Sequence, residues 1–120
     1  MNRTFINPCF LSIIFIFSLC SCGVAVSLSP GTVPRTPKSS DYKIQVYQKT
    51  DTIKVKYSTI GLIGGGDSGF TISCSYETVL NKVIEKARSI GADAIQIVQV
   101  DSPNIISTCY EIKAIAIAYE

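Results

Sequence analysis

Residues 76–100 read YETVLNKVIEKARSIGADAIQIVQV, which is a helix pattern followed directly by a strand pattern. Apolar residues recur at helical spacing along one face of the first part: Val79, Leu80, Val83, Ile84, Ala87 and Ile90. Ser75 is the expected N-cap, and Gly91 is the expected stop just beyond the last turn. The sequence therefore predicts a helix over about 76–90, followed by a strand over 94–100.

Further strand patterns lie on both sides of this helix. Upstream, apolar and polar residues alternate over 42–47 and again over 53–58, and the second run continues to Ile63. Downstream, 109–119 has strand character and is separated from 94–100 by turn residues. The order β-β-α-β-β predicts an α+β domain with a small four-stranded sheet, antiparallel or mixed, and one helix packed on one face. One disulfide is expected in this domain from its cysteines, as argued below.

The last strand carries two rows of side chains that point in opposite directions. One row is small: Ala114, Ala116 and Ala118. The other row is bulky: Ile115, Ile117 and Tyr119. Either row can face the helix, and a single helix covers only one face of the sheet. If the bulky row is left uncovered, it is a candidate partner surface bordered by Tyr47 or Tyr57, because exposed apolar patches mark contact sites. In the alternative interpretation, loops or the 51–58 stretch fold over it.

The N-terminus carries a targeting signal. Leu19-Cys20-Ser21-Cys22 closes a short apolar run, and Arg3 precedes that run. An aliphatic residue, two small residues and a cysteine form the signal of a bacterial lipoprotein, which an ordinary cleavage site fits less well. The run has about 10 residues, whereas a membrane span needs roughly 20. We therefore expect residues 1–21 to be a cleaved signal peptide and Cys22 to receive lipid.

The next segment changes in composition. Residues 23–40 read GVAVSLSPGTVPRTPKSS and contain three prolines among Ser, Thr and Gly. Such a composition buries little apolar surface, so a disordered or polyproline-like tether is predicted. The expected organisation is therefore a signal peptide over 1–21, a lipidated cysteine and tether over 22–40, and one α/β domain over 41–120.

Cysteine use agrees with an exported protein. The chain has five cysteines, and cleavage before Cys22 removes Cys9 and Cys20. Once lipid occupies Cys22, Cys74 and Cys109 remain in an oxidising compartment and are predicted to form one disulfide, with two buried free thiols as the alternative. The chain has no histidine, and two thiolates do not complete a zinc site. We therefore expect no metal and no cofactor.

Candidate chemistry is sparse. The run Gly64-Gly65-Gly66-Asp67-Ser68-Gly69 lacks the Lys-Ser/Thr pair of a phosphate-binding loop, so a flexible connector is predicted. Neither Ser68 nor Ser73 has an activating partner at a suggestive spacing, so we expect no enzyme activity and no catalytic residues.

Charge excludes one class of partner. Loss of Arg3 leaves ten of the eleven Lys and Arg residues against nine Asp and Glu, a net charge of +1. This balance and the exported location argue against nucleic acid as a partner. The lysines at 43, 49, 54 and 56 could face anionic headgroups, or they could form a solvated sheet edge that blocks aggregation.

Several segments in colinear order resemble the RcsF family of outer-membrane lipoproteins that sense envelope stress. They are Val46-Tyr47-Gln48-Lys49, Ile60-Gly61-Leu62-Ile63, Ser73-Cys74, Gly91-Ala92-Asp93-Ala94-Ile95 and Cys109-Tyr110. The run KARSIGADAIQIVQV is also similar to the broader YbjQ-type domains. The family has two disulfides and a longer, more basic tether, whereas this chain keeps cysteines for one bridge only.

The resemblance implies a lipid-anchored envelope lipoprotein in the outer membrane, facing the periplasm. It would act as a sensor or protein-interaction module, with an envelope protein as its partner and a role in envelope-stress signalling. The alternative is a structural envelope lipoprotein, or one that binds a small ligand or lipid, without a signalling role.

Overall fold

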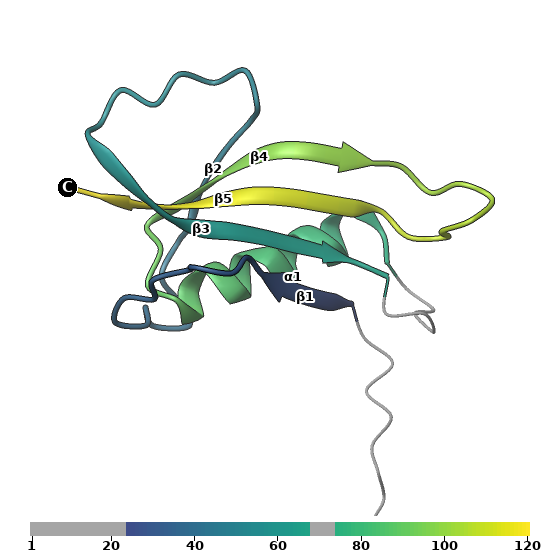
Figure 1. The fold of residues 1–120 in the computed structure, drawn as a ribbon, viewed down its shortest axis with the longest axis horizontal. Coiled ribbons are helices and arrows are strands. Elements are labelled where there is room, and N and C mark those ends of the chain that lie inside the picture. The colour runs from purple at the N-terminus through teal and green to yellow at the C-terminus, as the bar shows by residue number, and fades with distance from the viewer. Residues whose placement is uncertain (1–23, 68–73) are drawn as a thin grey trace, which may run out of the picture.

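A computed structural model describes residues 24–67 and 74–120 of the chain (Figure 1). The predicted signal peptide, the candidate lipid site Cys22 and the two serines Ser68 and Ser73 lie outside the described residues. One helix packs on one face of a five-stranded sheet of order β1-β3-β5-β4-β2. The elements are β1 (Ala25–Leu28), β2 (Gln45–Tyr47), β3 (Tyr57–Gly66), α1 (Tyr76–Ser89), β4 (Ala94–Asp101) and β5 (Glu111–Tyr119).

The sheet is mixed. β2 runs parallel to β4, and the other neighbouring strands run antiparallel. The predicted α+β class is confirmed, and so are the two strands after the helix. Of the upstream predictions, only residues 45–47 of the 42–47 run form a strand, and the 53–63 run becomes a strand only from Tyr57, because residues 53–56 belong to the loop before β3. The predicted number of four strands is too low by one, because the structure contains β1 in addition.

β1 comes from the segment that the sequence analysis assigned to a tether. It pairs with β3 from Ala25↔Gly66 to Leu28↔Ile63, and its apolar side chains pack against the core. Beyond β1, the N–H of Arg35 donates to the carbonyl of Ile90 at 2.9 Å. The tether prediction is therefore wrong for residues 24–40. The reason is that β3 offers an unpaired edge, and pairing satisfies backbone groups that composition alone does not reveal.

The helix follows its sequence pattern closely. The Oγ of Ser75 accepts the N–H of Thr78 at 3.3 Å, which confirms the predicted N-cap. At the other end Gly91 has φ +78°, and a Cβ at this position would lie 2.5 Å from the carbonyl oxygen of Thr36. Only glycine fits that backbone without strain, so Gly91 terminates the helix as predicted.

Small residues bring the sheet close to the helix. The alanine row of β5 is fully buried and belongs to the core that faces α1. On β3 a Cβ at Gly65 would lie only 2.7 Å from Cγ2 of Val83, so this position also requires close approach. The glycine run therefore continues β3 as far as Gly66, whereas the sequence analysis placed a loop from residue 64 onward.

A disulfide joins the start of the helix to the start of the last strand. Cys74 and Cys109 are bonded, with Cα atoms 5.0 Å apart and a sequence separation of 35 residues. Both cysteines are buried, and the N–H of Tyr110 donates to the carbonyl of Cys74 at 3.3 Å. The predicted bridge is confirmed, and the alternative of two free thiols is wrong.

Candidate functional site

The sheet face opposite α1, here called the open face, carries the bulky row of β5. Because the alanine row packs against α1, the side chains of Ile115, Ile117 and Tyr119 point to the open face. Ile115 is half-buried and pairs across the sheet with Leu62 of β3, which is 37% exposed. The open face therefore presents apolar side chains on two adjacent strands.

Ile117 does not share this exposure, because its exposed fraction is 0%. The 48–56 loop between β2 and β3 rises on the side of the sheet away from α1 (Figure 1). It is held there by the side chain of Gln96, whose Nε2 donates to the carbonyls of Gln48 at 3.4 Å and Asp51 at 3.2 Å. Of the predicted surface row, Ile115 and Tyr119 are thus partly accessible, and Ile117 belongs to the interior.

Two tyrosines lie at the end of the open face nearest the 48–56 loop. The hydroxyl groups of Tyr47 and Tyr119 are hydrogen-bonded at 2.9 Å. Burial, together with this hydrogen bond, raises the pKa of Tyr119 to about 12. The phenol therefore stays protonated at neutral pH and links β2 to β5. Tyr57, which pairs with Tyr119 from β3, is 39% exposed and borders the same area.

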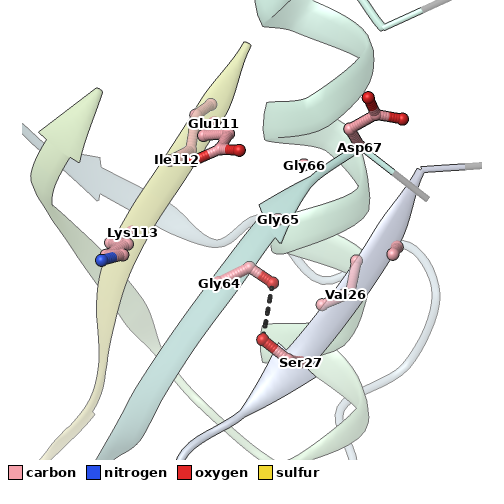
Figure 2. A pocket seen from close by; sticks show the side chains of 10 residues that line it. Val26, Ser27, Gly64, Gly65, Gly66, Asp67, Glu111, Ile112 and Lys113 are labelled. Carbon is pink, nitrogen blue, oxygen red and sulfur yellow. Dashed lines mark hydrogen bonds between the residues drawn. The ribbon is translucent and has the colours of Figure 1, made fainter. Parts of the chain in front are cut away.

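The far end of the open face holds a shallow hollow of about 270 Å³ between β1, β3 and β5 (Figure 2). Gly64 lies at its floor, where its carbonyl accepts the hydroxyl of Ser27 at 3.5 Å. Lys113 and Glu111 of β5 stand at its rim. The lining mixes apolar residues, such as Val26 and Ile112, with charges of both signs from Lys113 and Glu111. Within the residues that the structure describes, no cluster of His, Cys, Asp or Glu could hold a metal.

The turn between β4 and β5 exposes a pair of isoleucines that the sequence analysis did not single out. Ile105 and Ile106 are 104% and 96% exposed. The turn beneath them is ordered, because Oδ1 of Asn104 accepts the N–H groups of Ile106 at 2.8 Å and of Ser107 at 2.9 Å. The sequence signal was present as two adjacent bulky apolar residues inside a turn, where polar residues are usual.

The four lysines of the predicted basic patch are all exposed, and none of them lies in a strand. Lys49, Lys54 and Lys56 belong to the 48–56 loop, and Lys43 precedes β2. Lys56 forms a solvent-exposed ion pair with Glu120 at 3.1 Å. The interpretation as a sheet edge is therefore wrong for the three lysines of the 48–56 loop, which lies on the side of the sheet that carries the open face.

A charged cluster at the C-terminal end of α1 joins the N-terminal segment to the sheet. The carboxylate of Asp93 accepts from Lys38 at 2.9 Å, from the hydroxyl of Tyr42 at 3.0 Å and from the N–H of Tyr119 at 2.8 Å. Burial raises the pKa of Asp93, but these hydrogen bonds outweigh it, so that the pKa lies below its usual value of 3.8. The cluster favours the ionised carboxylate and stabilises the fold.

Asp93→Asn is expected to lower the free energy of unfolding by about 2–3 kcal/mol at pH 7, since charge-assisted hydrogen bonds are lost. A carboxyl group with a lowered pKa stabilises the fold above its unfolded pKa and loses that effect as pH falls through its folded pKa. The difference in unfolding free energy between the wild type and Asp93→Asn should therefore become smaller below pH 3.8. Urea denaturation of both proteins at pH 7 and pH 3 measures this difference.

The matched control for this prediction is Glu120→Gln, which breaks only the exposed ion pair with Lys56. It should change stability by about 0–1 kcal/mol at either pH. A gap between wild type and Asp93→Asn that stays the same at both pH values would contradict the assigned role of the ionised carboxylate.

Comparisons with family models, with curated proteins and with solved structures found no match to this chain. In the part of the chain that the structure describes, no helix is long and apolar enough to cross a membrane.

Proposed function

We propose that this chain is a lipid-anchored lipoprotein of the bacterial envelope whose folded domain is a sensor or protein-interaction module, with a role in envelope-stress signalling. The observation that carries the proposal is the open face. Leu62 and Ile115, paired between β3 and β5, keep apolar surface accessible, and the exposed Tyr57 pairs with Tyr119 further along the same two strands. Interfaces combine an apolar and aromatic centre with a polar rim, and this face has that composition.

The rim of the surface is supplied by neighbouring strands. Gln96 of β4 pairs with Ile115 on one side, and Lys113 and Glu111 lie further along β5 towards the hollow. A partner that covers Leu62 and Ile115 would thus meet polar groups around an apolar centre. We propose an envelope protein as this partner, and no nucleic acid and no catalytic role.

The location rests on two features. The signal Leu19-Cys20-Ser21-Cys22 supports attachment of lipid to Cys22, and the buried disulfide supports an oxidising compartment. We propose the outer membrane, with the domain facing the periplasm.

Cys22→Ala is expected to abolish acylation and to leave the precursor with residues 1–21 attached, because the acceptor thiol is lost. Labelling with a radioactive or clickable fatty acid and the intact mass of the purified protein measure both effects. Cys20→Ala is the matched control and should be acylated and cleaved like the wild type. A Cys22→Ala protein that still takes up the label would contradict the assignment.

The interaction role is tested by a photo-crosslinking amino acid placed at Leu62 in living cells, with Glu85 on the solvent side of α1 as the control position. We expect a crosslinked envelope protein from position 62 and none from position 85. Leu62→Asp should remove a crosslink formed from a probe at Tyr57 while the melting temperature stays close to that of the wild type. Equal crosslinking from positions 62 and 85 would contradict the proposed surface.

The hollow favours a second candidate function, the binding of a small polar ligand without signalling. Ser27, Lys113 and Glu111 offer hydrogen bonds around a floor that lacks side chains at Gly64 and Gly66. Gly66→Ala would take up part of this space, and its Cβ would meet only the flexible side chain of Glu111, at 3.0 Å from Cγ. If the hollow is the working site, this variant loses function and Leu62→Asp keeps it.

A further inference from the structure

The sheet brings the start of β1 and the β4–β5 turn to the same end. The strand register pairs Ala25 with Gly66, Gly65 with Ile112, and Asp101 with Glu111. The first residue of β1 and the last residue of β4 are therefore at one end of the sheet, which is called the anchor end here. Figure 1 shows the β4–β5 turn projecting beyond the strands at the end where the chain enters β1.

The proposed lipid site is very near this end. Val24, the first residue that the structure describes, is two positions beyond Cys22. Two fully extended residues span at most about 7 Å. The headgroup layer on each side of a bilayer is of similar thickness, about 5–8 Å. An acyl group on Cys22 would therefore hold the anchor end against the membrane surface, since residues 25–28 are committed to the sheet.

The β4–β5 turn has the composition that a lipid surface requires. Residues 102–110 carry no charge, and Ile105 and Ile106 stand fully exposed at the projecting end. The hydrogen bonds from the N–H groups of Ile106 and Ser107 to Asn104 constrain the backbone of the turn, so less conformational entropy is lost on insertion. Asp101 and Glu111 lie at the base of the turn, which limits insertion to the tip and makes the attraction apolar rather than electrostatic.

We propose that the tip formed by residues 102–108, with Ile105 and Ile106 at its apex, inserts into the bilayer interface beside the lipid anchor and fixes the orientation of the domain. This inference rests on the acylation of Cys22 proposed above. The strands then run away from the membrane surface, with the anchor end next to the bilayer, and the open face remains accessible to a protein partner. Ile105 and Ile106 are thereby assigned to contact with a lipid surface, and Leu62 and Ile115 to contact with a protein.

Two isoleucines alone bind a membrane weakly, but an acyl group on Cys22 would keep them close to the membrane surface. A short link between two binding elements gives an effective concentration of about millimolar or more. Insertion of the tip is therefore favourable in the acylated protein, although a free domain would hardly partition into membranes. This dependence on the anchor makes the proposal specific for the full lipoprotein.

The test uses the acylated full-length protein in vesicles of phosphatidylethanolamine and phosphatidylglycerol. Ile105→Cys introduces one reactive thiol, because Cys74 and Cys109 are bonded to each other and Cys22 carries lipid. An environment-sensitive dye on this thiol should show blue-shifted emission and several-fold stronger quenching by spin-labelled lipid than the same dye at Lys54→Cys. Lys54 is the matched control, because it is exposed in the 48–56 loop at the opposite end of the sheet.

A second pair of variants tests the isoleucines themselves. With the dye at Ser107→Cys, the double change Ile105→Ser and Ile106→Ser should reduce quenching several-fold. Val33→Ser should leave it unchanged, because Val33 is an exposed apolar residue outside the tip.

The outcomes separate the two proposals. If mass spectrometry shows acylation at Cys22 but the dye at position 105 stays in water, the tip proposal is overturned and the anchor stands. A blue shift without quenching by spin-labelled lipid would mean a protein contact, either a second copy or a partner, and would also overturn it. If Cys22 carries no acyl group, the proposed function fails, and the membrane-contact site fails with it.

Discussion

We expect Ile117→Asp to abolish cooperative folding of the domain and Ile115→Asp to leave the domain folded. Both residues point to the open face, but Ile117 is fully buried on the central strand and Ile115 is only half-buried. An unpaired carboxylate at position 117 costs about 4 kcal/mol or more, which approaches the total stability of about 5–15 kcal/mol expected of a small domain. The carboxylate at position 115 can reach water. Circular dichroism during thermal unfolding distinguishes the two variants.

The conservative variant Ile117→Val is the control for size, and it should cost about 0.5–1.5 kcal/mol. A wild-type melting curve for Ile117→Asp would contradict the placement of Ile117 in the interior. Under the proposed function, Ile115→Asp should also weaken crosslinking to the partner at an unchanged melting temperature.

Loss of the disulfide is the other change with a large expected effect. The double variant Cys74→Ala with Cys109→Ala should lose about 3–4 kcal/mol of unfolding free energy, because the bridge closes a loop of 35 residues in the unfolded chain. Changing both cysteines avoids a lone thiol that could pair between molecules. Urea denaturation with and without reductant provides the measurement.

Reduction should bring the wild type to the midpoint of the double variant and should leave the double variant unchanged. Two titratable thiols in protein that was alkylated during lysis of its native cells would show that the bridge is not formed there.

Features set by local chemistry were predictable from the sequence. The spacing of Val79, Val83 and Ala87 defines the buried side of α1, and Ser75 and Gly91 define its ends, because capping depends on neighbouring residues alone. The bridge between Cys74 and Cys109 followed from counting cysteines. The sequence could not decide whether the alanine row or the bulky row of β5 faces the helix, because this depends on which side of the sheet the helix packs.

Features set by distant pairing were not predictable. β1 has only four residues and precedes Pro30, so its composition resembles a linker until β3 provides a partner strand. The 48–56 loop is held by hydrogen bonds from Gln96 to two loop carbonyls, and such side-chain to backbone contacts over 45 and 48 residues leave no local pattern. Asp93 likewise gathers Lys38, Tyr42 and Tyr119 from separate parts of the chain.

The short outer strands of the sheet also influence how copies of the protein behave when crowded. β1 has four residues and β2 has three, so each outer edge offers few free backbone groups to a strand from another molecule. Further along, β4 is irregular between Ile97 and Gln99 and ends at Asp101, and both features discourage regular pairing. Under the proposed lipid anchor, which would concentrate many copies in two dimensions, such edges are expected to oppose growth of intermolecular β-sheet.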